Sequence, residues 1–148
     1  MKKSICLVAV LLCAWVSSFG QSNGLPQWKV VKEFHLTNQT NAIPTTVLFT
    51  PTKASIYRLS MYLSASANEA QNGQFYITVD WTDQTGLPGT NGGATDLSHG
   101  SETLSWIAPE TFSPKIGTPV TFTVVLSDNP PPQDASYSVA VIIEKLTH

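Results

Sequence analysis

Cysteine is confined to the extreme N-terminus of this 148-residue chain, where Cys6 and Cys13 are the two present. The rest of the chain therefore contains no disulfide and no thiolate ligand for a metal. Its stability has to come from an apolar core or from contacts with neighbouring chains. The length is sufficient to bury such a core without covalent help.

Charged residues are also scarce, at 12% of the sequence, and Arg58 is the single arginine. Because Lys2 and Lys3 lie at the very start, six basic residues face ten acidic ones in the remainder of the chain. No run of basic residues exists that would attract phosphates. The sequence therefore predicts neither nucleic-acid binding nor attachment to anionic membranes.

Long apolar runs are limited to Ile5–Val16, which follows two lysines and precedes small residues that end at Gly20. A basic start, a short apolar run and a small-residue site are typical of a secretory signal peptide, with cleavage expected before Gln21. The protein is therefore expected to be secreted, to the extracellular space or the periplasm. The expected segments are a signal peptide (1–20), a flexible lead-in (21–27) and one folded domain (28–148).

Two alternatives to cleavage remain open at the N-terminus. The apolar run could stay attached as an anchor, although it is short for a membrane span. Cys13 could carry a lipid, although Leu12 is larger than the residue that usually precedes a lipidated cysteine.

Helical periodicity is lacking after the signal, whereas alternation with a period of two is frequent. Residues 74–83 (QFYITVDWTD) are the clearest case, with Phe75, Ile77, Val79 and Trp81 on one face. This pattern predicts a strand with one buried face. Similar patterns predict six further strands: Trp28–Thr37 (Trp28, Val30, Phe34 and Leu36 on one face), Thr46–Thr50, Ser55–Ala65 (Tyr57, Leu59, Met61 and Leu63 inward), Thr103–Ala108, Pro119–Ser127 and Ser136–Leu146.

Seven or eight short strands separated by turn residues predict an all-β fold, an antiparallel β-sandwich of immunoglobulin or jelly-roll type. The lack of a Cys…Trp…Cys pattern weakens the immunoglobulin alternative. The segment Gln84–Glu102 is expected to be a long mobile surface loop, because five of its nineteen residues are glycines; a functional loop is the alternative.

Recognisable catalytic and metal-binding motifs are absent. His35, His99 and His148 do not have the short fixed spacing of metal ligands. A G-x-S-x-G match at residues 20–24 spans the expected cleavage site and is taken as a coincidence, since the motif needs a strand, a turn and a helix. The sequence therefore predicts no enzyme, no metal site and no cofactor.

A glycan is a possible ligand, because tryptophan rings can stack on sugars. Trp81 with Asp83 is the candidate sugar site, and Trp28 and Trp106 could add stacking surfaces. A glycoside hydrolase would instead need two carboxylates that converge across a cleft. The acidic residues available for that role are Asp80, Asp83, Glu102 and Glu110.

Three segments carry a resemblance to a known family: residues 49–59 (FTPTKASIYRL), 115–120 (KIGTPV) and 137–146 (YSVAVIIEKL). In this order they resemble the C1q/TNF-like jelly-roll domain, and they are also similar to β-sandwich domains of tail fibres and virion surfaces. The resemblance implies a jelly-roll fold, a homotrimer, and binding rather than catalysis. It also places the outward row Arg58, Ser60 and Tyr62 near the symmetry axis, where Arg58 would need a carboxylate partner.

The last predicted strand has apolar residues on both faces, since Ala140 and Ile142 belong to its outward row. An apolar outward row needs a cover. We therefore expect a secreted, non-catalytic protein that acts by protein–protein contact or self-assembly, with Tyr62 and Ile142 as candidate contact residues. Open alternatives are a carbohydrate-binding module, a glycoside hydrolase, and a monomer whose own N-terminal segment covers the last strand.

Overall fold

The computed structural model describes residues 25–67, 73–98, 103–127 and 135–147, with the backbone alone at 103–106. The expected signal peptide and its cleavage site lie outside these residues. Within them, no helix is long and apolar enough to cross a membrane. The strands are β1 (Gln27–Gln39), β2 (Ile43–Phe49), β3 (Tyr57–Ala67), β4 (Gln74–Thr82), β5 (Pro88–Asp96), β6 (Thr103–Phe112), β7 (Val120–Leu126) and β8 (Ala135–Thr147).

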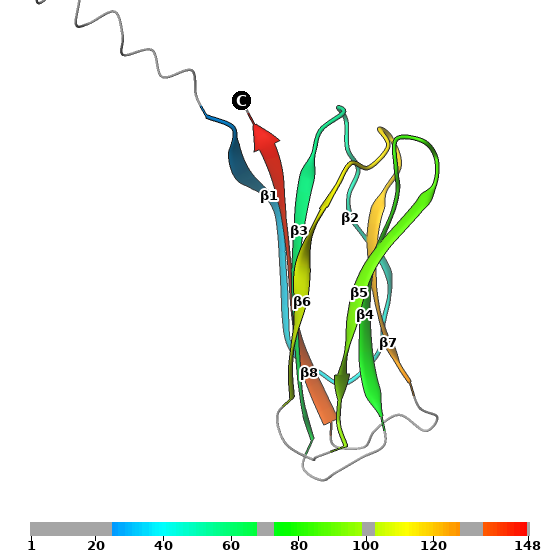
Figure 1. Cartoon of the computed structure of the whole chain (residues 1–148). Coiled ribbons are helices and arrows are strands. Elements are labelled where there is room, and N and C mark those ends of the chain that lie inside the picture. Colours follow the sequence, from blue (N-terminus) through cyan, green and yellow to red (C-terminus); the bar gives the residue numbers. More distant parts are fainter. Residues whose placement is uncertain (1–24, 68–72, 99–102, 128–134, 148) are drawn as a thin grey trace, which may run out of the picture.

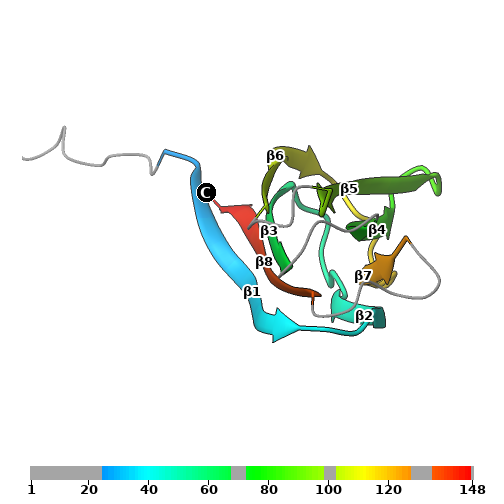
Figure 2. The same cartoon turned by 90° about the horizontal axis from the view of Figure 1, so that it is seen from below.

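The strands form two four-stranded antiparallel sheets, ordered β1-β8-β3-β6 and β2-β7-β4-β5. The sheets pack face to face as a sandwich (Figure 1; Figure 2 shows it along the strands). The first strand pairs with the last, the second with the seventh, the third with the sixth, and the fourth with the fifth. A chain doubled back on itself and wrapped in this way has jelly-roll topology. The predicted fold class is confirmed.

The core lies between the sheets and is built from the inward rows of alternating strands. The predicted inward residues of β4 (Phe75, Ile77, Val79 and Trp81) are all buried in one cluster with Tyr57, Leu59, Met61 and Leu63 of β3. Ring contacts link the sheets, with centroids 4.6 Å apart for Phe34 with Phe122 and for Phe75 with Tyr137. Period-two alternation therefore predicted this part of the core correctly.

The segment expected to be a long loop contains a strand, so that prediction is wrong. β5 pairs with β4 in unbroken register from Thr82↔Pro88 to Gln74↔Asp96. Its glycines allow close approach: a Cβ on Gly89 would lie 2.4 Å from the Trp81 ring, and one on Gly93 would lie 2.7 Å from the Ile107 side chain. Glycine in a strand interior often marks such an approach of neighbouring groups.

The predicted single apolar face of β1 is also wrong, because a β-bulge interrupts the strand. Val30 pairs with Glu144, but Lys32 pairs with the very next residue, Ile143. The extra residue exchanges the two faces of the strand. Trp28 therefore lies on the outer face of its sheet, whereas Phe34 lies inside against Phe122.

Candidate interaction surface

The predicted contact residues Tyr62 and Ile142 are brought together on the outer face of the β1-β8-β3-β6 sheet. Tyr62 pairs directly with Ala140, and Ser60 pairs with Ile142. With Met61 these four residues line a shallow hollow of about 60 Å³. All four are half-buried and uncharged, so the centre of this face is a small apolar surface that packing within the chain covers only partly.

A fixed polar group borders this hollow. Nε of Arg58 donates a hydrogen bond to Oε2 of Glu144 at 2.7 Å, and the guanidinium lies 4.8 Å from the ring centroid of Trp28. The hydrogen bond to Glu144 raises the pKa of Arg58 above its ordinary value. Arg58 was expected to need a carboxylate partner, and Glu144 of the same chain provides one.

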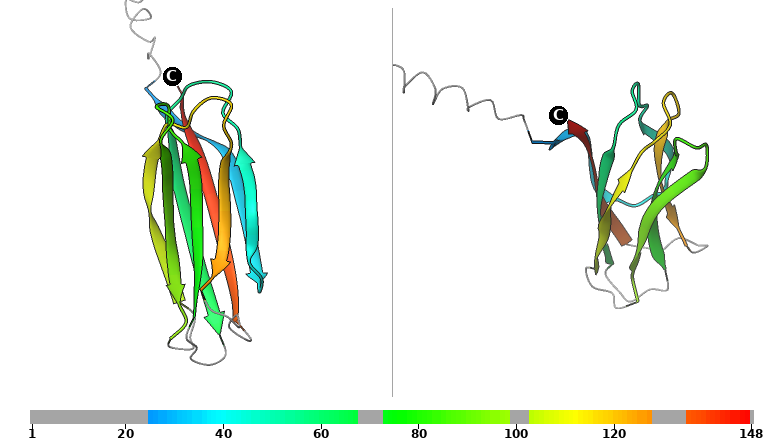
Figure 3. Two further views of the ribbon diagram at one scale, coloured as in Figure 1. Left: turned by 90° about the vertical axis from the view of Figure 1, so that its right-hand side faces the viewer. Right: turned by 45° about the horizontal axis from the view of Figure 1, so that its top comes forward.

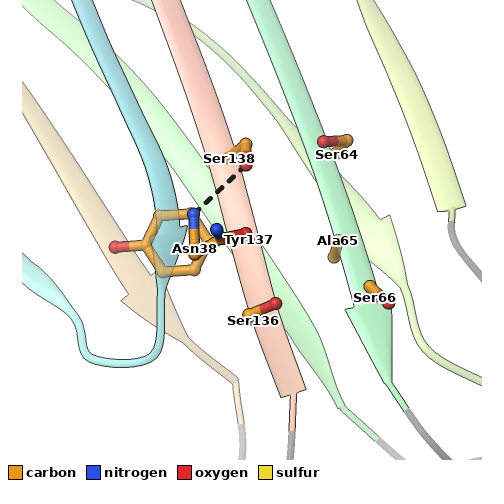
Figure 4. Close-up of a pocket in the computed structure, with 7 residues that line it drawn as sticks. All are labelled: Asn38, Ser64, Ala65, Ser66, Ser136, Tyr137 and Ser138. Carbon is orange, nitrogen blue, oxygen red and sulfur yellow. Dashed lines mark hydrogen bonds between the residues drawn. The ribbon is translucent and has the colours of Figure 1, made fainter.

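A second hollow, of about 90 Å³, continues the same face toward the other end of β3 and β8. Four serines project there in two register pairs, Ser64 with Ser138 and Ser66 with Ser136, as Figure 4 shows. Asn38 has a positive φ of 52°, and its backbone N–H donates to the Ser138 hydroxyl at 3.3 Å. No motif in the sequence had indicated this hollow. The pattern that marks it is Ser-x-Ser, which occurs at residues 64–66 and 136–138.

The four outermost strands are poor templates for adding another strand. Pro44, Pro88 and Pro109 lie in β2, β5 and β6, and each removes a backbone donor. β1 has two irregularities in its register and carries Lys29 and Lys32. Proline, lysine and bulges are the devices by which natural sheets discourage edge-to-edge pairing. Addition of a strand at these edges is therefore disfavoured.

The candidate sugar site does not present a ring to solvent. Trp81 is only 9% exposed, and its ring packs against Phe112 with centroids 4.7 Å apart. One face of Trp28 is covered by Arg58, and the side chain of Trp106 lies outside the described residues. The tryptophan side chains that the structure describes therefore offer no open pair of stacking surfaces.

Asp83 organises the β4–β5 turn. Its Oδ1 accepts hydrogen bonds from the backbone N–H of Thr85 at 2.8 Å, the Thr85 hydroxyl at 2.7 Å and the backbone N–H of Leu87 at 2.9 Å. These hydrogen bonds lower the pKa of Asp83 below its ordinary value. The bond from the Thr85 hydroxyl has the largest effect, and the bond from the Leu87 N–H has the next largest. Its carboxylate is thus engaged in holding a turn.

Replacing Asp83 by alanine is expected to lower the melting temperature at neutral pH and to have little effect in acid. The hydrogen bonds favour the ionised carboxylate, so its contribution is complete above the ordinary pKa of about 3.9 and is lost as the pH falls through the lower folded value. Thermal unfolding of both proteins from neutrality down to about pH 2 measures this convergence. A difference that persists unchanged in acid would contradict the assigned role.

The candidate carboxylates that the structure describes besides Asp83 do not converge on one site. Asp80 belongs to β4, where Oδ2 accepts a 3.3 Å hydrogen bond from the Thr78 hydroxyl, whereas Glu110 belongs to β6 in the opposite sheet. Glu102 and His99 lie outside the described residues. Among the residues that are described, no group of three or more His, Cys, Asp or Glu side chains could hold a metal ion.

The order of the eight strands in the described residues defines a jelly-roll β-sandwich. No family model and no curated protein matches the sequence. The chain is similar to a solved structure of infectious bursal disease virus, Gx strain, at 16% identity and a TM-score of 0.45, covering 82% of this chain and 33% of the viral one. It thus spans about a third of that viral protein's length.

Two further solved structures are similar at comparable identity. The VP2 subviral particle of infectious bursal disease virus is 15% identical with a TM-score of 0.42, over 80% of this chain and 32% of that one. A structure of Bacillus endospore appendages, described as disulfide-linked pili, is 14% identical with a TM-score of 0.34, over 86% of this chain and 95% of that one. The fold assignment above rests on strand order and not on these similarities.

Proposed function

We propose that this protein is a secreted, non-catalytic β-sandwich that assembles with copies of itself into a homotrimer. The observation that carries the proposal is the uncharged hollow between Tyr62 and Ile142 on the outer face of the β1-β8-β3-β6 sheet. An apolar centre on a sheet face gains free energy when a second surface removes it from water.

The surroundings of the hollow have the composition of a protein–protein interface. Trp28 and Arg58 lie at its border, and Glu144 fixes the arginine in one position. Interfaces combine a desolvated apolar centre with a polar rim, and tryptophan, tyrosine and arginine are enriched among the residues that dominate binding. The proline-, lysine- and bulge-containing edges further favour contact through this face over strand addition.

The trimeric state and the secretory route have separate support. The state of three copies rests on the resemblance of residues 49–59, 115–120 and 137–146 to C1q/TNF-like domains. Secretion rests on the apolar run and small-residue site at the N-terminus. Mass measurements on the exported protein test both the number of copies and the removal of the N-terminal segment.

Replacing Ile142 by glutamate is expected to dissociate the assembly. The new carboxylate would be buried without a partner at the centre of the contact, and substitutions at such positions raise a dissociation constant about thirtyfold or more. Light scattering at micromolar concentration should give the mass of three chains for the wild type and of one chain for Ile142→Glu.

Val125→Glu is the matched control, because Val125 is 46% exposed on the outer face of the opposite sheet. It adds the same charge and should leave the trimer intact. A wild-type mass of one chain across the whole concentration range would refute self-assembly. Loss of the trimer in both variants would place the contact elsewhere.

A further inference from the structure

Three connections meet at one end of the sandwich, which we call the loop end: residues 50–56, 83–87 and 113–119. Figure 1 shows them together at the top, with the start of β1 and the end of β8 beside them, and Figure 3 shows the same end from two further sides. The loop end therefore combines five segments that are far apart in the sequence.

Backbone hydrogen bonds connect the segments of the loop end to one another. The N–H of Gly117 donates to the carbonyl of Pro51 at 2.9 Å, and the N–H of Lys115 donates to that of Thr82 at 2.8 Å. The N–H of Leu146, in β8, donates to the carbonyl of Ile56 at 3.0 Å. Each connection is thus bonded to a neighbouring segment, so the backbones of these segments are held relative to one another.

Each of the three connections exposes one large aliphatic side chain. The exposed fractions are 45% for Ile56, 63% for Leu87 and 48% for Ile116, and Leu25, just before β1, is 80% exposed. Loop tips normally carry small or polar residues. The segments of this end therefore expose four aliphatic side chains, each of which would have a lower free energy in an apolar environment than in water.

Lysines flank these aliphatic side chains. Lys29, Lys53, Lys115 and Lys145 all belong to segments of the loop end, and none has an ion-pair partner among the described residues. Of the acidic groups there, Asp83 is held by its turn and Glu144 by Arg58, while Glu110 lies in β6. The four lysines are far apart in the sequence of an acidic chain, so no basic run indicates that they belong to one end of the fold.

We propose that the loop end docks on an anionic lipid surface. Ile56, Leu87 and Ile116 would enter the boundary between headgroups and acyl chains, while the lysines meet the lipid phosphates. Apolar side chains combined with lysine on one face are the chemistry of interfacial membrane binding, and each lysine near an anionic surface adds attraction. A neutral or cationic lipid surface would not attract the lysines.

The combination of side chains at the loop end favours a membrane over a protein as the occupant. Exposed aliphatic side chains suit the boundary of the acyl chains, and lysines without an ion-pair partner among the described residues suit lipid phosphates. This surface is separate from the sheet face assigned to self-assembly, so the two proposals can fail independently.

Partitioning of the exported protein onto vesicles tests the proposal. Vesicles of phosphatidylcholine with an equal part of phosphatidylglycerol should bind the wild type, whereas phosphatidylcholine alone should not. Leu87→Ser with Ile116→Ser is expected to lower the partition coefficient about tenfold or more by removing buried aliphatic area. Lys53→Gln with Lys115→Gln is expected to lower it about thirtyfold, since each lysine contributes roughly fivefold.

Matched controls separate these effects from general loss of apolar area or charge. Val47→Ser with Val125→Ser removes two exposed aliphatic side chains from the outer face of the β2-β7-β4-β5 sheet and should change partitioning less than twofold. Lys32→Gln removes one lysine from the middle of β1 and should likewise have little effect. All variants keep the same N-terminus, so any difference between them arises from the folded domain.

Two results would overturn the proposal. The first is binding that does not depend on phosphatidylglycerol or that is equal in the loop-end and control variants. The second is an unchanged partition coefficient combined with a lower mass by light scattering in the loop-end variants. That second result would make the loop end a contact between copies of the chain. Measuring Ile142→Glu in parallel shows whether a change in assembly alone alters vesicle binding.

Discussion

Replacing Ile77 by alanine is expected to lower the free energy of unfolding by about 2–5 kcal/mol. Ile77 has no exposed surface and lies in β4, which pairs with β5 on one side and β7 on the other. A strand held on both sides cannot move inward to fill a cavity, so the loss of contacts is not recovered. Urea unfolding with an unchanged slope against denaturant would measure this loss as stability alone.

Thr78→Ala is the control for this prediction, because it changes the next residue of the same strand. Thr78 faces outward and its hydroxyl donates to Oδ2 of Asp80 at 3.3 Å, a long bond on a half-buried surface. Its replacement should cost well under 1 kcal/mol, as is usual for surface substitutions. Equal losses at Ile77 and Thr78 would mean that the two faces of β4 have been misassigned.

Replacing Gly89 by alanine is expected to cost about 1–3 kcal/mol, as overpacking of a tightly packed site does. The added Cβ would lie 2.4 Å from atoms of the Trp81 ring, much closer than any normal contact. The ring is buried and packs against Phe112. Either the indole leaves its rotamer or β5 moves away from β4, and both reduce stability in thermal or urea unfolding.

A double-mutant cycle gives the sharper form of this test. In a Trp81→Leu background the alanine at position 89 meets a smaller side chain, so its cost should fall well below the value in the wild type. Thr90→Ala, at the neighbouring position of β5, should show no such coupling. Additive losses at Gly89 and Trp81 would indicate that the glycine serves another purpose.

Most of the core could be predicted because its signal is local. In β3, β4, β7 and β8 every second residue is apolar, and side chains two apart in a strand share a face whatever the strand pairs with. The outward apolar residues Ala140 and Ile142 were visible for the same reason, as exceptions to that alternation. Tyr62 and Ile142 could therefore be named as candidates before their pairing was known.

The features that were missed depend on information that alternation does not carry. At Gly89, Gly92 and Gly93 of β5, neighbouring groups occupy the space that a side chain would need. The strand therefore lacks the alternating apolar residues by which a strand is predicted from sequence. The bulge after Val30 reverses the faces of β1 without any turn residue to mark it. The loop end depends on strand order, which decides which distant segments become neighbours.

The pairing of the first strand with the last has a consequence for how the chain folds. Gln27 lies opposite Thr147, and among the described strands β4 and β5 are the consecutive pair that is joined by a short hairpin turn. Contacts of such high sequence separation make folding slow. For a chain that crosses a membrane from its N-terminus, β1 has no partner until β8 has also crossed. The topology thus makes completion of the β1-β8-β3-β6 sheet wait for the last strand of the chain.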